Sequence, residues 1–466
     1  MKARTEPPRG RVLANGIRAS LGNFLEYFDW FIYASFSLYF AASFFPSENK
    51  TAQLLSTSLV FALGFLMRPI GSWLLGRFSD AAGRRAALTL SVALMSAGSL
   101  LIACTPSFAT IGVAAPILLT VARLLQGLSL GGEWGSSAAY LAEIAGPGRR
   151  GLFSGIGYVA VVFGQLLSVG VLLVLQHFLT REELQAWGWR IPFLLGAAMG
   201  LVIFYLRRAM DESDQYETHK REAAELEQTG IAPEKKGLLA VVAEYPKQFI
   251  VAILLVTGGT VSYYTYTIYM SKYMVNTAGF DENTAATVSF AALFIFMALQ
   301  PVTGALSDKI GRRTILLIFS GGIMLVTVPA FMIISQTDSA LVVFGLMSLG
   351  VVLTTGYSAL AGIVKAELFP TKIRALAVGL SHAVGNALFG GTTESVALSF
   401  KGAGHESGFY WYVVLCAGMT FFAALFLYRD TSKQSVLDTP SVLSDAAADR
   451  LGTPAGEAAA RPGPGA

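Results

Sequence analysis

The most restrictive feature of this chain is a series of long apolar runs that recur from end to end. A helix needs about 20 largely apolar residues to cross the hydrocarbon core of a bilayer. Twelve stretches meet that description, at residues 19–42, 52–76, 86–104, 112–138, 150–177, 188–206, 248–274, 284–306, 314–335, 340–364, 374–399 and 408–428. Charged residues make up only 14% of the chain, against about 25% in an average soluble protein. The pattern predicts an all-α membrane protein with twelve transmembrane helices.

Two polar segments interrupt or follow these apolar runs. Residues 207–247 are rich in charge and too polar to cross a membrane, and they separate the first six runs from the last six. Residues 431–466 are low in complexity and end in GTPAGEAAARPGPGA, a composition typical of disorder. We therefore expect an N-terminal six-helix bundle at 1–206, a cytoplasmic linker at 207–247, a C-terminal six-helix bundle at 248–430 and a disordered cytoplasmic tail at 431–466.

The distribution of basic residues predicts the orientation in the membrane. With twelve spans, both termini lie on one side, and that side also contains most of the 34 lysines and arginines. The opposite loops contribute only Lys50, Arg181, Lys272 and Lys401. Because lysine and arginine are enriched in cytoplasmic loops, both termini are expected to be cytoplasmic.

The two halves of the chain repeat each other. The segment GRFSDAAGRR at 76–85 and the segment GALSDKIGRR at 304–313 agree at six of ten positions, at an offset of 228 residues. The segments AEIAGPGRRG at 142–151 and AELFPTKIRA at 366–375 correspond at an offset of 224 residues. Two pairs at nearly one offset indicate structural repeats, and transporters built from repeats bind their substrate near the middle of the membrane, between the repeats.

These loops and several further motifs resemble a known family. The G-x-x-x-D-x-x-G-R-R loop after the second span, echoed after the eighth, resembles the signature loop of the major facilitator superfamily. The stretches GNFLEYFDWF (22–31), FLMRPIG (65–71), ARLLQGLSLGGEWG (122–135), WGWRIPF (187–193) and LRRAMDES (206–213) resemble its metabolite:H⁺ symporter branch. Two more, YMSKYMVNTAG (269–279) and KAELFPTKIRALAVGLSHAVGNALFGG (365–391), resemble the members that carry 2-oxoglutarate. The resemblance implies a major facilitator fold, with two six-helix bundles related by pseudo-two-fold symmetry and working by alternating access.

Ionisable residues within the predicted spans are candidates for function, because each costs about 2.5–3.5 kcal/mol at the centre of a membrane helix. An arginine side chain matches a carboxylate with two parallel hydrogen bonds, so Arg68 and Arg123 are the expected anchors for a dicarboxylate. Arg190, near the outer end of its span, is expected to attract or gate the anion. The acids expected to carry the proton are Asp29, then Glu26 and Glu133. Alternatively, these charges form fixed ion pairs that hold the first, second and fourth spans together.

Uncharged polar residues at helical spacing extend the candidate site. Tyr158 and Gln165 are seven residues apart, His382 and Asn386 are four apart, and Thr260 and Tyr264 share a face of the seventh span. They are expected to bind the keto oxygen or the second carboxylate, and His382 to relay a proton. The alternative is that each of them only packs between helices, which is the more usual role of such a residue.

The resemblance also implies that residues of the repeated loops act as gates. These residues are Asp80, Arg84, Arg85, Asp308, Arg312 and Arg313, and a second set consists of Glu143, Arg150, Glu367 and Arg374. A simpler interpretation of the arginines alone is that they anchor the loops on the cytoplasmic side.

The expected function is proton-coupled symport of 2-oxoglutarate into a bacterial cell across its inner membrane. Alternatives are another organic acid such as citrate or shikimate, a zwitterion such as proline or betaine, or a transceptor that senses the metabolite. The expected partners are the organic anion, protons and the lipid bilayer, acting on a monomer. No catalytic activity, cofactor, metal or nucleic acid is expected.

Overall fold

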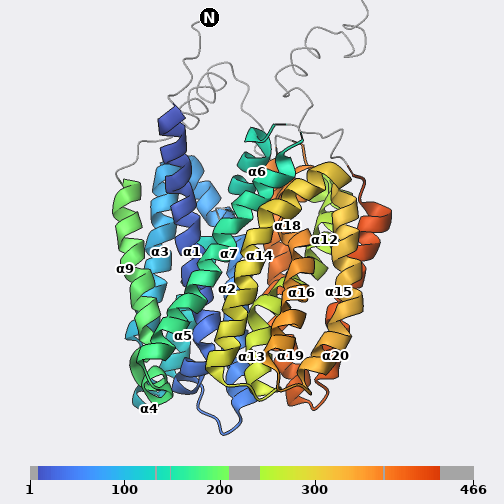
Figure 1. Cartoon of the computed structure of the whole chain (residues 1–466). Coiled ribbons are helices and arrows are strands. Elements are labelled where there is room, and N and C mark those ends of the chain that lie inside the picture. The colour runs from blue at the N-terminus through green and yellow to red at the C-terminus, as the bar shows by residue number, and fades with distance from the viewer. Residues whose placement is uncertain (1–8, 132–133, 147, 209–241, 371–372, 431–466) are drawn as a thin grey trace, which may run out of the picture.

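The structure is a computed structural model and describes residues 9–131, 134–146, 148–208, 242–370 and 373–430. Every regular element among these residues is helical (Figure 1). The helices run roughly parallel to one long axis, with α4 at one end of the molecule and α6 at the other (Figure 1).

The N-terminal half contains the first six spans. Its elements are α1 (Arg9–Phe44), α2 (Lys50–Ala82), α3 (Arg84–Cys104), α4 (Phe108–Ile111), α5 (Ala114–Leu130), α6 (Trp134–Ile144), α7 (Arg150–Phe178), α8 (Arg181–Glu183), the π-helical turn η1 (Leu184–Gly188) and α9 (Arg190–Arg208). The fourth span consists of α5 and α6 in succession.

The C-terminal half contains the other six spans. Its elements are α12 (Pro246–Tyr264), η2 (Thr265–Tyr269), α13 (Met270–Asn276), α14 (Glu282–Ile310), α15 (Arg312–Ile334), α16 (Ala340–Ser358), α17 (Ile363–Ala366), α18 (Arg374–Gly385), η3 (Asn386–Gly390), α19 (Thr393–Gly402), α20 (Ser407–Phe422) and η4 (Ala423–Leu427). The seventh, eleventh and twelfth spans each contain one π-helical turn, and such turns often mark functional sites.

The helices account for all twelve predicted spans. Eight described helices are long and apolar enough to cross a membrane, and the bent pair formed by residues 181–188 and 190–205 makes a ninth. The remaining three are α1, which contains buried acids, the broken pair α5–α6, and the series α18–η3–α19. One expectation was wrong in detail: Lys272 does not lie in a loop but is buried in α13.

Side chains at the first residues determine where several spans begin. The Asn49 side chain accepts hydrogen bonds from the backbone N–H groups of Thr51 and Ala52 at the start of α2. Asp281 caps α14 in the same way by accepting from Thr284, and these hydrogen bonds hold the pKa of this exposed carboxyl below its ordinary value. The caps satisfy N–H groups that the first turn of a helix leaves without partners.

The backbone supports the internal repeat found in the sequence. Gly83 ends α2 with φ 96° and ψ 157°, and Gly311 ends α14 with φ 94° and ψ 152°. These two glycines occupy the same place in the repeated loops, and each donates its N–H to the serine carbonyl four residues earlier. Positive φ at this position favours glycine strongly. We call the end of the molecule that contains these two loops the GRR end.

Close glycine contacts hold α2 against α5. An added Cβ at Gly127 would lie 2.0 Å from the carbonyl oxygen of Gly64, and one at Gly131 would lie 2.1 Å from that of Arg68. Two helices this close accept no side chain between them, as in the small-residue interfaces of membrane proteins. The contact brings Arg68 of α2 near Arg123 of α5.

The two halves contact each other at both ends. Towards the GRR end, Gly151 of α7 meets Gly304 of α14, and Gly135 of α6 meets Gly379 of α18. Towards the opposite end, the hydroxyls of Ser58 in α2 and Ser395 in α19 lie 3.0 Å apart. The two halves therefore meet at both ends of the molecule.

Replacing Gly127 by valine is expected to destabilise the fold, because the added Cβ and its two methyl groups have no room beside Gly64. Overpacking of this kind costs about 1–3 kcal/mol and sometimes more. Thermal unfolding of the purified protein measures the effect. The matched control is Gly76→Val in α2, where an added Cβ meets nothing within 4 Å, so an equal loss of stability in both variants would contradict the packing argument.

Candidate functional site

Arg123 lies in the middle of the N-terminal half and is fully buried. Its guanidinium carbon lies 4.0 Å from the ring centroid of Trp30, 4.4 Å from that of Tyr33 and 5.0 Å from that of Phe61. Nη1 donates a hydrogen bond of 2.7 Å to Oε1 of Gln126. The buried Nε and Nη2 atoms have no hydrogen-bond partner in the described structure. Aromatic faces therefore stabilise this cation while leaving part of its hydrogen-bonding capacity unused.

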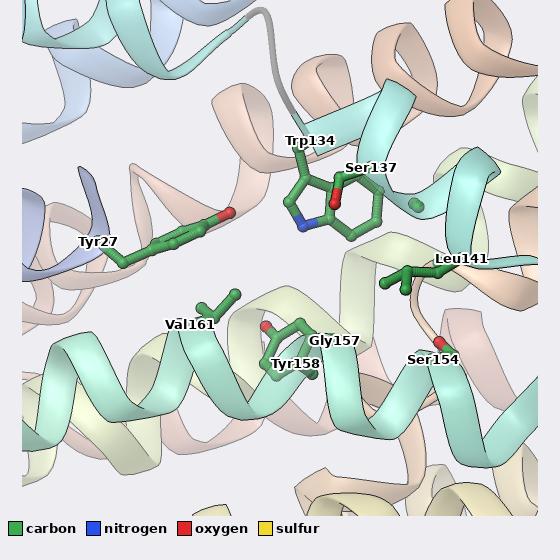
Figure 2. Close-up of a pocket in the computed structure, with 10 residues that line it drawn as sticks. Tyr27, Trp134, Ser137, Leu141, Ser154, Gly157, Tyr158 and Val161 are labelled. Carbon is green, nitrogen blue, oxygen red and sulfur yellow. The ribbon is translucent and has the colours of Figure 1, made fainter. Parts of the chain in front are cut away.

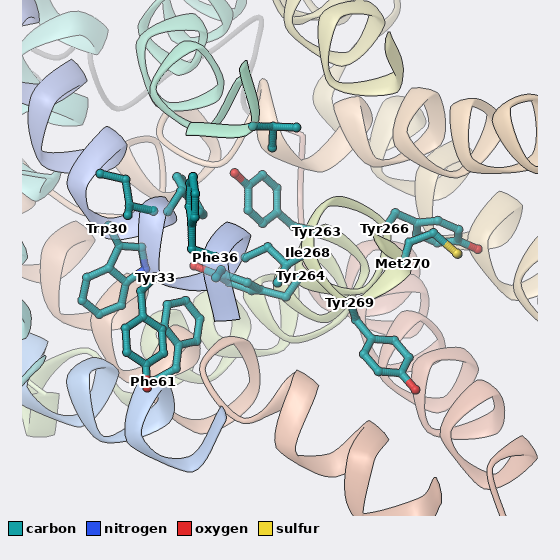
Figure 3. Close-up of a cluster of buried hydrophobic side chains, with 14 of the residues drawn as sticks. Trp30, Tyr33, Phe36, Phe61, Tyr263, Tyr264, Tyr266, Ile268, Tyr269 and Met270 are labelled. Atoms are coloured by element: carbon teal, nitrogen blue, oxygen red, sulfur yellow. The ribbon is translucent and has the colours of Figure 1, made fainter. Parts of the chain in front are cut away.

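Arg68 contacts the same indole ring. Its guanidinium carbon is 4.3 Å from the Trp30 centroid and 4.1 Å from that of Phe65, and it lies beside the hydroxyl of Tyr264. Its Nε and Nη2 atoms also lack partners within the described residues. Figure 3 shows how Trp30, Tyr33 and Phe61 of the N-terminal half approach Tyr264 of the C-terminal half. The two arginines thus share one aromatic environment at the junction of the halves.

Asp29 is connected to Arg123 through an intervening amide. Its Oδ2 accepts a 2.9 Å hydrogen bond from Nε2 of Gln126, the residue whose carbonyl oxygen binds Arg123. Its Oδ1 accepts from the hydroxyl of Ser99, which also lies 2.8 Å from Gln126 Nε2. The carboxylate is therefore held in the field of Arg123 without touching it.

Of the other two acids predicted to carry a proton, the structure describes only Glu26. Glu26 is buried, and its Oε1 accepts a 3.2 Å hydrogen bond from Ser91. Glu133 lies outside the described residues. Among the described residues, no carboxylate lies within ion-pair distance of Arg68 or Arg123.

The predicted polar residues of the C-terminal half form one connected chain. Thr260 donates a 2.5 Å hydrogen bond to Oδ1 of Asn386, and the Asn386 amide nitrogen lies 3.0–3.1 Å from the ring nitrogens of His382. His382 Nδ1 in turn accepts from Nζ of Lys365 at 2.8 Å. Asn386 begins the π-helical turn η3, and Tyr264 directly precedes η2.

Tyr158 and Gln165 link α7 to the C-terminal half. The Gln165 amide accepts from the hydroxyl of Tyr263 at 2.6 Å and donates to the carbonyl of Thr267 at 3.0 Å. The ring of Tyr158 packs edge-on against that of Tyr263, with centroids 6.2 Å apart. These residues therefore contact α12 and η2, as expected for residues between the repeats.

A small cavity lies between α1, α6, α7 and the turn before α17 (Figure 2). Its volume is about 40 Å³. Polar groups from three of these elements face it: the hydroxyls of Tyr27, Tyr158, Ser137 and Ser154 and the indole of Trp134. One water needs roughly 10–15 Å³ of such space, so the cavity has room for a few waters only, and a larger solute requires the halves to separate.

Arg190 lies apart from the other candidates. It begins α9, with its guanidinium carbon 4.2 Å from the centroid of Trp189. It donates to the carbonyls of Ala186 and Thr105, at the end away from the GRR loops. The structure thus places this arginine at the rim of the N-terminal half.

At the GRR end, Asp308 joins the two halves. Its carboxylate oxygens accept hydrogen bonds of 2.9 and 3.0 Å from the backbone N–H groups of Gly151 and Leu152, in the first turn of α7. Arg312 forms an ion pair with Asp308 at 2.8 Å and lies 3.6 Å from a carboxylate oxygen of Glu367. A carboxylate at the N-terminus of a helix is favoured both by the free N–H groups and by the helix dipole.

Two of the remaining predicted gating residues, Arg313 and Arg374, bind backbone carbonyls of the C-terminal half. Arg313 stays within its own half and binds the carbonyls of Ala424 and Leu425. Arg374 donates to the carbonyls of Ala366 and Phe369, Arg150 is buried at the start of α7, and Arg85 is exposed. The side chains of Asp80, Arg84 and Glu143 lie outside the described residues.

Sequence analysis missed several groups that the structure brings into this region. Gln126 lies three residues after Arg123 and therefore on the same helix face, a signal that was available. The buried ion pair between Lys272 and Glu394, with 2.5 Å between Nζ and Oε1, joins α13 to α19 and could not be inferred from spacing. Lys365 was visible as a rare charge at the edge of a span but received no role.

Comparison with known proteins identifies the family. Residues 16–441 match the family described as "Sugar (and other) transporter", so the chain belongs to this family of multi-pass membrane transporters. It is 48% identical to the alpha-ketoglutarate permease of Escherichia coli K12 over 413 residues, which are 89% of this chain and 93% of that protein. It is 33% identical to a citrate-proton symporter of Salmonella typhi (88% of this chain, 92% of that one) and to a putative proline/betaine transporter of Staphylococcus aureus COL (91% and 89%).

Solved structures agree in fold. A crystal structure of a D-xylose-proton symporter superposes with a TM-score of 0.70, covering 91% of this chain and 99% of that one at 18% sequence identity. A partially occluded, inward-open structure of the Escherichia coli xylose transporter gives a TM-score of 0.69 over 90% of this chain and 98% of that one, at 20% identity. At these identities the likeness concerns the fold, which is the predicted twelve-helix major facilitator arrangement.

Proposed function

We propose that this protein is a secondary transporter that carries 2-oxoglutarate, a dicarboxylate, into a bacterial cell together with protons. The observation that carries this proposal is the pair Arg68 and Arg123, both buried beside Trp30 and both with unused N–H groups. A guanidinium group with unused N–H groups can donate two parallel hydrogen bonds to a carboxylate, and it keeps its positive charge. The 48% identity to a permease of alpha-ketoglutarate supports the choice of substrate.

The proposed cycle is alternating access by movement of the two bundles, 1–206 and 248–430, around the enclosed centre. The bias of basic residues supports a GRR end that faces the cytoplasm, with both termini inside. Asp308 then forms part of a cytoplasmic gate, because its bonds to Gly151 and Leu152 must break when the halves separate there. A monomer in the bacterial inner membrane suffices, since both bundles belong to one chain.

Asp29 is the proposed proton carrier, because it is coupled to Arg123 through Gln126. In the absence of substrate, the positive charge of Arg123 offsets part of the cost of burying an ionised Asp29. A bound carboxylate offsets that positive charge, so that Asp29 is then best neutralised by a proton. Substrate and proton therefore bind together, as symport requires. Glu26 and Glu133 remain the second choices for this role.

The relatives also support the alternatives in substrate. The citrate symporter and the proline/betaine transporter are each 33% identical to this chain. Two cations in the site favour an anion with more than one carboxylate over a zwitterion such as betaine. The proposed binding residues are Arg68, Arg123, Tyr158, Gln165, Thr260, Tyr264 and Asn386, with His382 as a relay and Arg190 as an outer attractor.

The test of this function is uptake of labelled 2-oxoglutarate into proteoliposomes, with and without an inward proton gradient. We expect accumulation driven by the gradient and competition by unlabelled dicarboxylates. Accumulation of citrate or betaine but not of 2-oxoglutarate, in the same vesicles, would reject the proposed substrate.

Arg123→Gln is expected to weaken substrate binding roughly ten- to hundredfold, because it removes a charged hydrogen-bond donor, worth about 1.5–3 kcal/mol. Uptake at low substrate concentration should disappear while the protein still inserts in the membrane. Arg123→Lys serves as the control that retains the charge and is expected to be affected less. Unchanged uptake by Arg123→Gln would remove Arg123 from the binding site.

Asp29→Asn is expected to abolish proton-driven accumulation but to preserve exchange of internal for external substrate, since exchange needs no net proton movement. Gradient-driven uptake and counterflow in the same proteoliposomes separate these two activities. Asp338→Asn, on an exposed loop, should leave both unchanged. If a proton gradient still drove accumulation in Asp29→Asn, the coupling group would be another acid.

A further inference from the structure

Lys365, on α17 of the C-terminal half, is a buried cation that the proposed function does not yet use. Its side chain is nearly inaccessible, with 2% relative exposure. Nζ donates to His382 Nδ1 at 2.8 Å and lies 4.5 Å from the centroid of the Trp134 ring. Within the described residues, no carboxylate lies within ion-pair distance of this ammonium group.

Two other buried cations of the same half are paired with carboxylates. Lys272 contacts Glu394 at 2.5 Å, and Arg312 contacts Asp308 at 2.8 Å. Burying an ammonium group without a counter-charge is costly, and removing the charge from such a site is often neutral or stabilising. A lysine at this position therefore points to a role other than stability.

Lys365 does not line the cavity of Figure 2 but is connected to it through its neighbours. Trp134 lines that cavity, and His382 stacks on Trp134 with ring centroids 3.6 Å apart and planes 11° apart. Gly362, three residues before Lys365, also lines the cavity. The Trp134 ring that the ammonium group faces therefore belongs to the boundary of the cavity in Figure 2, whereas Lys365 itself lines a separate small pocket beside Val256 and Tyr357.

Lys365 also lies opposite the arginines of the other half. Arg68 is near enough to His382 for their charges to interact, and His382 is the hydrogen-bond partner of Lys365. The N-terminal half thus presents a guanidinium group to the junction of the halves, and the C-terminal half presents an ammonium group to it. A lysine on a flexible stem can follow an anion over several ångströms.

We propose that Lys365 binds the second carboxylate of the transported anion, while Arg68 and Arg123 bind the first. This inference rests on the proposed transport of a dicarboxylate. A dianion held in this way bridges the two halves and stabilises the enclosed state, whereas a monocarboxylate contacts one half only. The site would therefore select dicarboxylates through closure as well as through contact, because a ligand shifts a conformational equilibrium only by its differential affinity for the two states.

The test compares 2-oxoglutarate with 2-oxovalerate, which has the same chain length but lacks the distal carboxylate. Both are measured as competitors of labelled substrate on the purified full-length protein, in the wild type and in Lys365→Met. We expect Lys365→Met to lose roughly ten- to hundredfold in affinity for 2-oxoglutarate and to bind 2-oxovalerate as the wild type does.

Thermal unfolding of the same variant separates binding from stability. Lys365→Met should unfold at the wild-type temperature or above it, because methionine fills a similar volume without an unpaired charge. Lys272→Met is the matched control, since it leaves Glu394 buried without its partner and should unfold at a lower temperature. A marked loss of stability in Lys365→Met would assign Lys365 a structural role and overturn the inference.

The outcomes for the inference and for the proposed function are distinct. If the wild type binds no dicarboxylate, the proposed function fails, whatever Lys365→Met does. If the wild type prefers 2-oxoglutarate over 2-oxovalerate and Lys365→Met keeps that preference, the function stands and Lys365 is not the second anchor. If Lys365→Met binds both 2-oxoglutarate and 2-oxovalerate more weakly by the same factor, the inference is also contradicted, because only the distal carboxylate of 2-oxoglutarate should lose its partner.

Discussion

The structure depends on the burial of two guanidinium groups without carboxylates to neutralise them. Among the described residues, Arg68 and Arg123 contact aromatic rings, a tyrosine hydroxyl and one glutamine amide, but no acid. Cation–π contacts compensate for part of the lost hydration, yet N–H groups on both side chains remain without partners. A buried charge in this state is expensive. The organic anion that we propose as substrate would offset this cost.

The packing of the helices determines where the two arginine side chains lie. Glycines let α2 and α5 approach closely, and Arg68 of α2 and Arg123 of α5 both contact the Trp30 ring. The opposing half supplies Tyr264 and the chain from Thr260 through Asn386 and His382 to Lys365. At the GRR end, Asp308 closes the junction on the first turn of α7. The proposed binding groups therefore come from both halves, which contact each other through close glycine packing as well as through polar contacts.

Much of this arrangement could be predicted from the sequence, for identifiable reasons. Apolar runs of a fixed length predicted all twelve spans, and the repeated GRR loops predicted two equivalent halves, which Gly83 and Gly311 support with nearly identical dihedral angles. Rare charges within apolar runs pointed to Arg68, Arg123 and Asp29. Their partners were harder to find, because partners such as Gln126 and Ser99 are ordinary residues whose importance depends on contacts between distant helices. Arg190, predicted from its charge alone, lies away from the arginine pair because it begins its helix at the rim.

The most direct measurement of the central claim is an experimental structure of the protein with 2-oxoglutarate bound. This account predicts one carboxylate within hydrogen-bonding distance, about 2.7–2.9 Å, of the guanidinium groups of Arg68 or Arg123, inside the space enclosed by the two halves. A substrate bound elsewhere, with both arginines still facing only Trp30 and its neighbours, would contradict it.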